Sequence, residues 1–338
     1  MNRSKLPLLS PLLLPVILLL SACGSAKGGS ALTVYSGQHE QTTVRLVAAF
    51  ERQTGIKVDL RSADEATLGN QITQEGANSP ADVFYAENTP VLEALSKRGL
   101  LTTVRPRTLA EVPQRYDSAQ GRWIGVSARV SALVYNTSKL TQAELPGSIL
   151  DLATPRWQGK LGFAPSETDF QPLLSAILKL DGTAAAERWL KGLQANGRIY
   201  PDNETVVNQV DNGESAIGPI NSYYWYRLRD EKGATHMHSA LHYYTPGDPG
   251  DLVDISGAAV LNTSAHPSAA QDFLAFLVSR SAQTLIAHSQ SYEYPLRPGV
   301  SPARGLRPLA TLSPAALTPA ELGDGSAALA LEQKLGLL

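Results

Sequence analysis

Two polar side chains directly follow short apolar runs that have the character of β-strands. His39 comes after the run at 32–35, and Glu87 comes after the run at 83–85. Ligands of open α/β sheets gather at the carboxyl ends of the strands, so we expect both side chains at the ligand-bearing edge of a sheet. Taken singly, His39 could be an ordinary loop histidine, and Glu87 could be a solvated carboxylate at a helix start.

A second candidate site is the aromatic run NSYYWY at 221–226, in a chain with 7% aromatic residues. The ordinary interpretation is the start of a core helix. Four consecutive aromatic side chains point around most of a helix, however, whereas a helix buries one stripe. If Asn221 or Ser222 caps the helix, Tyr223 and Tyr224 stand in its first turn, where the helix dipole favours phenolate. Two phenolates there would form a credible site for a hard cation.

The elements expected around these residues form two successive α/β blocks. The first block has predicted strands at 32–35, 56–60 and 83–85 and helices at 41–52, 66–75 and 90–98. Its strand-helix-strand order predicts parallel crossovers. The second block has predicted strands at 132–135, 161–164, 198–200 and 216–220 and helices at 170–180, 184–195 and 206–212.

The C-terminal part adds a predicted strand at 253–261, helices at 269–279 and 282–288, a Pro- and Ala-rich connector at 302–319, and a helix at 326–335. Hydrophobic periodicity does not assign these pieces to either block.

The N-terminal segment predicts export and lipidation. Basic residues precede an apolar run at 6–20, and the motif LSAC ends at Cys23, as in a signal peptide with a lipobox. We therefore expect a signal peptide at 1–22 and acylation of Cys23, with a tether at 23–30 that holds the protein at a membrane. The alternative is that Cys23, the single cysteine, is a small buried core thiol.

Composition limits the classes of function. About 315 residues follow the leader, more than one hydrophobic core usually covers, so two domains are expected. A net charge of -2 gives no basic surface for nucleic acid. The sequence contains no G-x-S-x-G, P-loop, H-E-x-x-H or paired-cysteine motif, which argues against an exported enzyme.

Longer motifs give the sequence a family resemblance. It is similar, over essentially the whole mature length, to the ferric-ion-binding receptors of the periplasmic binding-protein superfamily, the bacterial transferrin-like group. The matching motifs are YSGQHE, PADVFYAEN, ATPRWQGKLG, WLKGLQANGRIY, NSYYWY, DPGDLVDISGAAVL and EYPLRP. The resemblance implies an α/β fold of the type 2 periplasmic-binding-protein class, with two α/β lobes, a hinge and an interlobe cleft. On the family's chain path, lobe 1 would comprise 31–129 plus 253–304, and lobe 2 would comprise 130–252 plus 305–338.

The resemblance also implies a ligand and its binding residues. Family members bind Fe(III) through the residues that correspond here to His39, Glu87, Tyr223 and Tyr224. Two phenolates and one carboxylate match the charge of Fe(III), and an oxygen-rich donor set without thiolate favours a hard ion. Free tyrosine has a pKa near 10, so only a strongly Lewis-acidic cation holds two phenolates near neutral pH.

In the family, a synergistic anion such as phosphate or carbonate fills the remaining coordination positions. Asn203 and Asn221 match asparagines that contact the anion in phosphate-dependent members, and Arg129 matches an arginine near the cleft. We assign Thr168 to the same expected anion site.

The sequence departs from those members in the loop at 165–170, PSETDF, where they have small residues with free amides. Glu167 and Asp169 add negative charge there, and Asn88 replaces a glutamine beside Glu87. A differently placed anion and direct water ligation both stay open.

The function implied by the resemblance is that of a monomeric, extracytoplasmic, membrane-anchored lipoprotein of an ABC importer, at the cell surface or in the periplasm. Its partners would be a permease and an ATPase that recognise the closed, iron-loaded form. One alternative is a receptor for an organic ligand, such as a polyamine, thiamine or a sugar, with the tyrosines as a stacking platform. An exported enzyme is the alternative from another class.

Overall fold

The computed structural model describes Met1, residues 31–312 and residues 316–338. Apart from Met1, the predicted signal peptide and the predicted acylation site at Cys23 lie outside the described residues. Within those ranges, no helix has the length and apolar character needed to cross a membrane.

The strands of the described chain form a mixed sheet with the order β2-β1-β3-β9-β4-β7-β5-β6, and β8 and β10 pair with β4. Their bounds are β1 (Leu32–Ser36), β2 (Val58–Ser62), β3 (Val83–Ala86), β4 (Ile124–Asn136), β5 (Leu161–Phe163), β6 (Gly197–Ile199), β7 (Ile217–Asn221), β8 (Ser239–His242), β9 (Val253–Val260) and β10 (Tyr294–Pro295).

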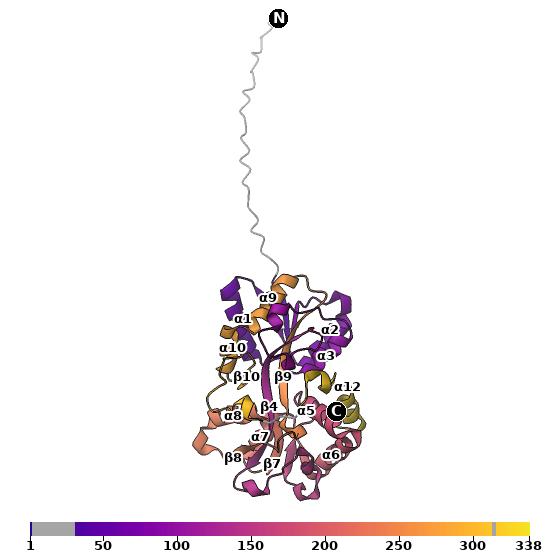
Figure 1. The fold of residues 1–338 in the computed structure, drawn as a ribbon, viewed down its shortest axis with the longest axis vertical. Helices are drawn as coiled ribbons and strands as arrows, with labels where there is room; N and C mark the ends of the chain where they lie inside the picture. The colour runs from indigo at the N-terminus through magenta and orange to yellow at the C-terminus, as the bar shows by residue number, and fades with distance from the viewer. Residues whose placement is uncertain (2–30, 313–315) are drawn as a thin grey trace. The chain divides into compact units, whose positions relative to one another are not determined.

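The helices divide between the two ends of this sheet (Figure 1). Near one end lie α1 (Glu40–Thr54), α2 (Glu65–Glu75), α3 (Thr89–Lys97), α9 (Pro267–Leu277) and α10 (Arg280–Ala287). Near the other lie α5 (Phe170–Asp181), α6 (Thr183–Asn196), α7 (Asn203–Asp211), α8 (Ser222–Lys232) and α12 (Ser326–Lys334). The short helices α4 (Pro106–Leu109) and α11 (Pro319–Leu322) lie in connections.

Strand β4 joins the two parts of the sheet. Its first half pairs antiparallel with β9, from Ile124 to Val130, and its second half pairs antiparallel with β7 and β8, from Ser131 to Asn136. Figure 1 shows β4 and β9 running between the two groups of helices. The predicted parallel pairing is confirmed for β1 with β2 and with β3.

Separate apolar cores lie on either side of the middle of β4. One core contains Phe50 and Trp123 and reaches Val130. The other contains Trp189 and begins on β4 at Leu133. The two ends of the sheet therefore have separate main cores, and Ser131 and Ala132 of β4 lie at the boundary between them.

The sequence-based prediction of β4 was too short. It placed a strand at 132–135, whereas β4 begins at Ile124. The added stretch carries Ser127, Arg129 and Ser131, which are buried, although such residues usually indicate an exposed strand or a loop. Strands β8 and β10 were not predicted, whereas the other predicted strands and helices are confirmed within about four residues.

Candidate functional site

His39 lies at the junction between β1 and α1, where it occupies the N-cap position of α1 without capping the helix through its side chain. The neighbouring Gln38 fixes this junction. Its side-chain oxygen accepts a hydrogen bond from the His39 backbone at 2.7 Å, and its Nε2 donates to Ser256 Oγ at 2.8 Å and to Glu293 Oε1 at 3.0 Å. The His39 ring is thus presented at the carboxyl end of β1, as predicted.

Glu87 lies at the carboxyl end of β3, and its Oε1 is 3.7 Å from His39 Nε2. The side chain of Glu87 is 13% exposed, so it is not the solvated helix-start carboxylate that the sequence left as an alternative. The next residue, Asn88, anchors this loop, because Glu65 accepts hydrogen bonds from its backbone at 2.8 Å and from its side chain at 2.7 Å.

Tyr223 and Tyr224 stand in the first turn of α8, directly after β7. Their rings stack with centroids 4.0 Å apart, and the Tyr223 ring meets the His39 ring edge-on at 5.0 Å. Asn221 is the N-cap residue of α8, but its side chain makes no cap hydrogen bond and instead accepts one from Ser131 Oγ at 3.3 Å. Asn221 is therefore the N-cap residue by position but does not cap the helix through its side chain, and the two tyrosines still stand in the first turn.

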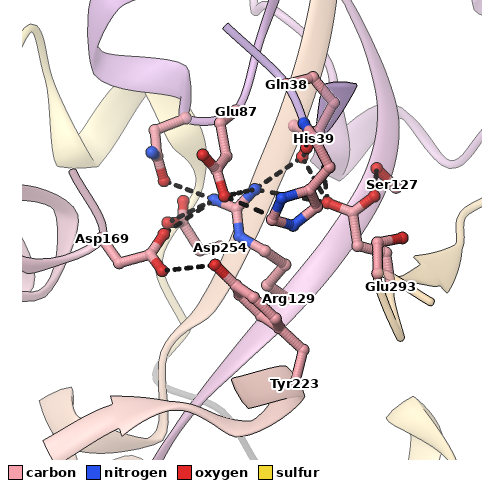
Figure 2. Close-up of polar contacts among 12 residues, drawn as sticks. Gln38, His39, Glu87, Ser127, Arg129, Asp169, Tyr223, Asp254 and Glu293 are labelled. Carbon is pink, nitrogen blue, oxygen red and sulfur yellow. Dashed lines mark hydrogen bonds and ion pairs between the residues drawn. The ribbon is translucent and has the colours of Figure 1, made fainter. Parts of the chain in front are cut away.

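Arg129 lies at the centre of the site (Figure 2), with a side chain that is fully buried. Its guanidinium is within 3.2–3.5 Å of carboxylate oxygens of Glu87, Asp169, Asp254 and Glu293. A buried cation requires such compensation, because removal from water costs several kcal/mol for an uncompensated ion. The carboxylates come from four different segments of the chain, so Arg129 ties these segments together.

The remaining residues of the expected anion site lie on one side of the tyrosines. Asn203, Asn221 and Asp169 line a cavity of about 10 Å³, with Ser131. Such a volume is close to the minimum that one water needs. Thr168 is half-buried in the preceding loop, and the neighbouring Glu167 accepts a hydrogen bond from the Asn203 backbone at 3.1 Å.

Burial governs the protonation of the site. It raises the pKa of Tyr223 and of Tyr224 well above the usual 10, and the carboxylate of Asp169 adds to the effect. The helix dipole was expected to favour the phenolate form, whereas burial favours the phenol form and raises the pKa of both tyrosines. Burial also raises the pKa of Glu87 and lowers the pKa of His39 below 6.5. Without a cation, the tyrosines are therefore phenols and His39 is a neutral imidazole at neutral pH.

The arrangement provides unfilled donor atoms. His39 Nε2 and Asp169 Oδ1 are buried and have no hydrogen-bond partner within the described chain. His, Cys, Asp and Glu side chains alone do not form a metal-binding group of three or more anywhere in that part of the chain. A metal ion at this site would therefore depend on the tyrosine oxygens, and the Tyr223 hydroxyl lies 3.4 Å from Asp169 Oδ2.

Sequence reasoning missed the polar network that supports these residues. Gln38 lies within the motif YSGQHE, and Glu293 is the first residue of EYPLRP. Asp254 lies within DPGDLVDISGAAVL. Asp254 and Glu293 are 1% and 0% exposed. Carboxylates in otherwise apolar stretches were a usable signal, since such groups are rarely buried unless paired.

Comparison with known protein families gives an extensive match. The family of bacterial extracellular solute-binding proteins matches residues 45–308. The "major ferric iron-binding protein" of Neisseria meningitidis serogroup B is 39% identical over 311 residues, which cover 90% of this chain and 93% of that protein. The "Fe(3+)-binding periplasmic protein" of Serratia marcescens is 37% identical over 316 residues, which cover 92% of this chain and 94% of that protein.

Solved structures with the same fold include proteins described with iron. Iron-bound HitA from Pseudomonas aeruginosa is 46% identical, with a TM-score of 0.87, and the match covers 90% of this chain and 99% of that one. The Trichodesmium protein IdiA (FutA), in complex with iron and citrate ligands, is 30% identical, with a TM-score of 0.79 and the same coverage. These structures are periplasmic binding proteins, and the expected two-lobe type 2 α/β fold is confirmed.

Gly37 allows the His39 loop to approach α2, which generates a first prediction. A Cβ at Gly37 would lie 2.3 Å from Glu65 Cβ and 2.6 Å from Glu65 Cα. We expect Gly37→Ala to lower the free energy of unfolding by about 1–3 kcal/mol, as overpacking does. Urea denaturation measures the change.

The matched control is Gly147→Ala, whose Cβ would meet only Thr245 Cγ2, at 3.5 Å. This variant should stay within about 0.5 kcal/mol of the wild type. Equal stability of the two variants would show that the chain near Gly37 relaxes without cost.

Proposed function

Because this chain belongs to the bacterial extracellular solute-binding proteins, we propose that it is the substrate-binding component of an ABC importer and that its cargo is Fe(III). The observation that carries the proposal is the convergence of His39, Glu87 and Tyr223, which follow three separate strands, with Tyr224 stacked on Tyr223. The relatives described as ferric iron-binding proteins cover almost the whole chain, which supports the same cargo.

The proposed ligands are His39, Glu87, Tyr223 and Tyr224. Neutral His39 offers an imidazole nitrogen with a vacant hydrogen-bonding position. The tyrosines, whose pKa is raised by burial, can ionise near neutral pH only if a strongly Lewis-acidic cation replaces their protons. Two phenolates and the Glu87 carboxylate then supply three negative charges to a trivalent ion, and this donor set of oxygen and nitrogen favours a hard metal.

A receptor for an aromatic or cationic organic ligand is a weaker interpretation of the same residues. A stacking platform must present an open ring face. Here the rings of Tyr223 and Tyr224 stack on each other, and they are 1% and 8% exposed. The Tyr223 hydroxyl, rather than its ring face, is directed to Asp169. We therefore favour an ion over polyamine, thiamine or sugar as cargo.

We propose that the chain divides into lobe 1, at 31–129 plus 253–304, and lobe 2, at 130–252 plus 305–338. The separate cores on either side of the middle of β4 support this division, although Leu306 and Leu312 pack with the first core. Strands β4 and β9 would form the hinge. His39 and Glu87 then belong to lobe 1 and the tyrosines to lobe 2, so iron would favour closure by joining ligands from both.

Membership of an extracellular family supports an extracytoplasmic location. We propose further that the chain acts as a monomer that is anchored at the membrane through acylated Cys23, and that its closed form delivers iron to a permease and its ATPase. Relatives described as periplasmic or extracellular binding proteins, rather than enzymes, support a role without catalysis.

The ligand assignment predicts a loss of binding in two tyrosine variants. Tyr223→Phe and Tyr224→Phe should each weaken Fe(III) binding by more than about 100-fold, because loss of a supporting residue alone costs roughly 10–100-fold. The visible tyrosinate-to-iron charge-transfer band should lose most of its intensity. Titration of the purified full chain with ferric citrate measures both effects.

Tyr226→Phe is the matched control on the same helix. Its hydroxyl donates to the Gly305 carbonyl at 3.3 Å, and its ring stacks on Tyr292. Affinity and colour should therefore be unchanged in this variant. If Tyr223→Phe and Tyr224→Phe behave like Tyr226→Phe, the two residues are core tyrosines and the iron site lies elsewhere.

Protonation of the empty site predicts the pH dependence of binding. Both phenols carry protons at neutral pH, since burial raises the pKa of each above 10, and both must lose them to bind iron. The logarithm of the association constant should therefore rise by about two per pH unit above neutrality. In acid the Glu87 carboxylate also takes up a proton, because burial raises its pKa. This proton competes with iron as well, so mild acid should release iron.

Competition against a chelator of known pH dependence measures this slope. Residual binding by Tyr224→Phe should show a slope of about one, since one phenol remains. An association constant that does not change with pH would contradict the exchange of phenol protons for iron.

The lipobox generates a prediction that is independent of iron. Cys23→Ala should abolish acylation and membrane retention while iron affinity stays unchanged, because Cys23 is the only residue in the chain that could carry the thioether-linked lipid. Detergent-phase partitioning of the expressed protein, with the wild type as control, measures the change. Continued partitioning of the variant into the detergent phase would mean that another segment anchors the chain.

A further inference from the structure

Asp169 is positioned unusually for an aspartate at the start of a helix. It is the N-cap residue of α5, where an aspartate normally accepts a hydrogen bond from a backbone N–H of the first turn. Its side chain makes no such bond. Instead the carboxylate points to the Tyr223 hydroxyl, as Figure 2 shows, and lies 3.4 Å from it. Asp169 therefore does not stabilise the start of α5 through its side chain, and it contacts Tyr223 in the site instead.

This carboxylate is buried and only partly satisfied. The side chain is 4% exposed, and Oδ1 has no hydrogen-bond partner in the described residues, although it lies 3.4 Å from Arg129 Nη2. A buried carboxylate oxygen without a hydrogen bond is costly. Since Oδ1 is directed into the site, a bound cation would remove that cost.

The separations around Tyr223 suit ligands of one small ion. Neighbouring donors of an octahedral ion bound at about 2.1 Å lie roughly 3 Å apart. The Tyr223 hydroxyl is 3.4 Å from Asp169 Oδ2, and His39 Nε2 is 3.7 Å from Glu87 Oε1. These two pairs of donor atoms therefore need only small shifts to become neighbouring ligands of one ion.

The expected exogenous anion has little space beside Asp169. The cavity that Asp169 lines with Asn203 and Asn221 has a volume of about 10 Å³, whereas a single water occupies about 30 Å³ of the liquid and needs at least about 10–15 Å³ of probe volume in a cavity. Asn221 Nδ2 and Asp169 Oδ1 are both unpartnered there, and one water could bridge them. Phosphate or carbonate could enter this cavity only if Asp169 moved, whereas a cavity of about 280 Å³ on the other side of the site is lined by His39, Arg45 and Arg227.

Charge balance is also consistent with an aspartate ligand. With two phenolates, Glu87 and Asp169, the donor set would carry four negative charges against three on Fe(III). Arg129 contacts both carboxylates, at 3.5 Å and 3.4 Å, and contributes one positive charge toward this excess. The same two guanidinium nitrogens also contact Asp254 and Glu293, so Arg129 shares its charge with the surrounding network.

We propose that Asp169 is a fifth protein ligand of the ferric ion and takes the place of the exogenous synergistic anion. This inference rests on the proposed function, because it assumes that iron binds between His39, Glu87, Tyr223 and Tyr224. Since His39, Glu87 and Asp169 do not by themselves form a metal-binding group in the described chain, iron must draw Asp169 toward the other ligands. It makes iron binding by this chain independent of phosphate and carbonate. The sixth coordination position is left to water.

The test uses the purified full chain in buffer freed of phosphate and carbonate. Iron is supplied as ferrous perchlorate and oxidised by oxygen freed of carbon dioxide in the presence of the protein. The wild type should develop the same charge-transfer band with phosphate, with bicarbonate and with neither. Asp169→Asn, which fills the same space with a poor ligand, should bind more than about 100-fold more weakly in all three buffers.

Asp169→Gly distinguishes a ligand from a residue that only supports Tyr223. This variant vacates the space of the carboxylate, so formate, acetate or bicarbonate should restore the band, and the ferric EPR spectrum should change with the anion that restores it. Asp181→Asn is the matched control, since it removes an exposed carboxylate at the opposite end of the same helix, α5, and should leave binding unchanged.

The outcomes separate the two proposals. If the wild type shows no tyrosinate-to-iron band in any buffer, the proposed function itself is wrong. If the wild type forms the band only with phosphate or bicarbonate, or if Asp169→Asn keeps wild-type affinity, iron binding stands and Asp169 is not a ligand. Lack of rescue of Asp169→Gly by every carboxylate anion would likewise overturn the inference.

Discussion

The buried guanidinium of Arg129 is the constraint on which the geometry of the site depends. A cation that is 0% exposed must be matched by negative charge, and four carboxylates from distant segments supply it. Removal of one carboxylate would leave the others to compensate, whereas removal of Arg129 would leave them buried and mutually repulsive. The position of Arg129 near the middle of β4, between two independent cores, makes this ion-pair network the connection between the two ends of the sheet.

The same network explains why a cation should favour the closed arrangement. Glu87 and Asp169 lie on opposite sides of the proposed hinge, and Arg129 alone cannot neutralise both of them together with Asp254 and Glu293. Burial raises the pKa of Asp169 to about 6 and that of Asp254 to about 7, although Arg129 opposes the rise. The empty site is thus short of positive charge. Under the proposed function a metal ion would supply it, and binding and closure would then be coupled through electrostatics as well as through shared ligands.

The sequence indicated individual candidate residues of the site more readily than it indicated their environment. His39 and Glu87 could be found by a local rule, because polar side chains that follow strands lie at the binding edge of an α/β sheet. Tyr223 and Tyr224 could be found because a helix cannot bury four consecutive aromatic residues on one face. The network around Arg129 obeys no local rule. It joins residues that are up to 255 positions apart, as in the hydrogen bond from Gln38 to Glu293, and only the fold brings them together.

Strand β4 shows why the sequence did not predict the whole of the fold, since only its second half was predicted as a strand. Periodicity assigns a strand from apolar residues, but β4 passes between the two cores and carries Ser127, Arg129 and Ser131 at the crossing point. These polar residues end the apparent strand in the sequence, although backbone pairing with β9 continues through Ser127 and Arg129, and pairing with β7 begins at Ser131. Strand β4 carries polar residues here because it holds the buried guanidinium of Arg129 in the candidate site. A strand without that role could be apolar throughout. A polar interruption between two apolar stretches of a long strand is therefore where a binding site should be sought in this class of fold.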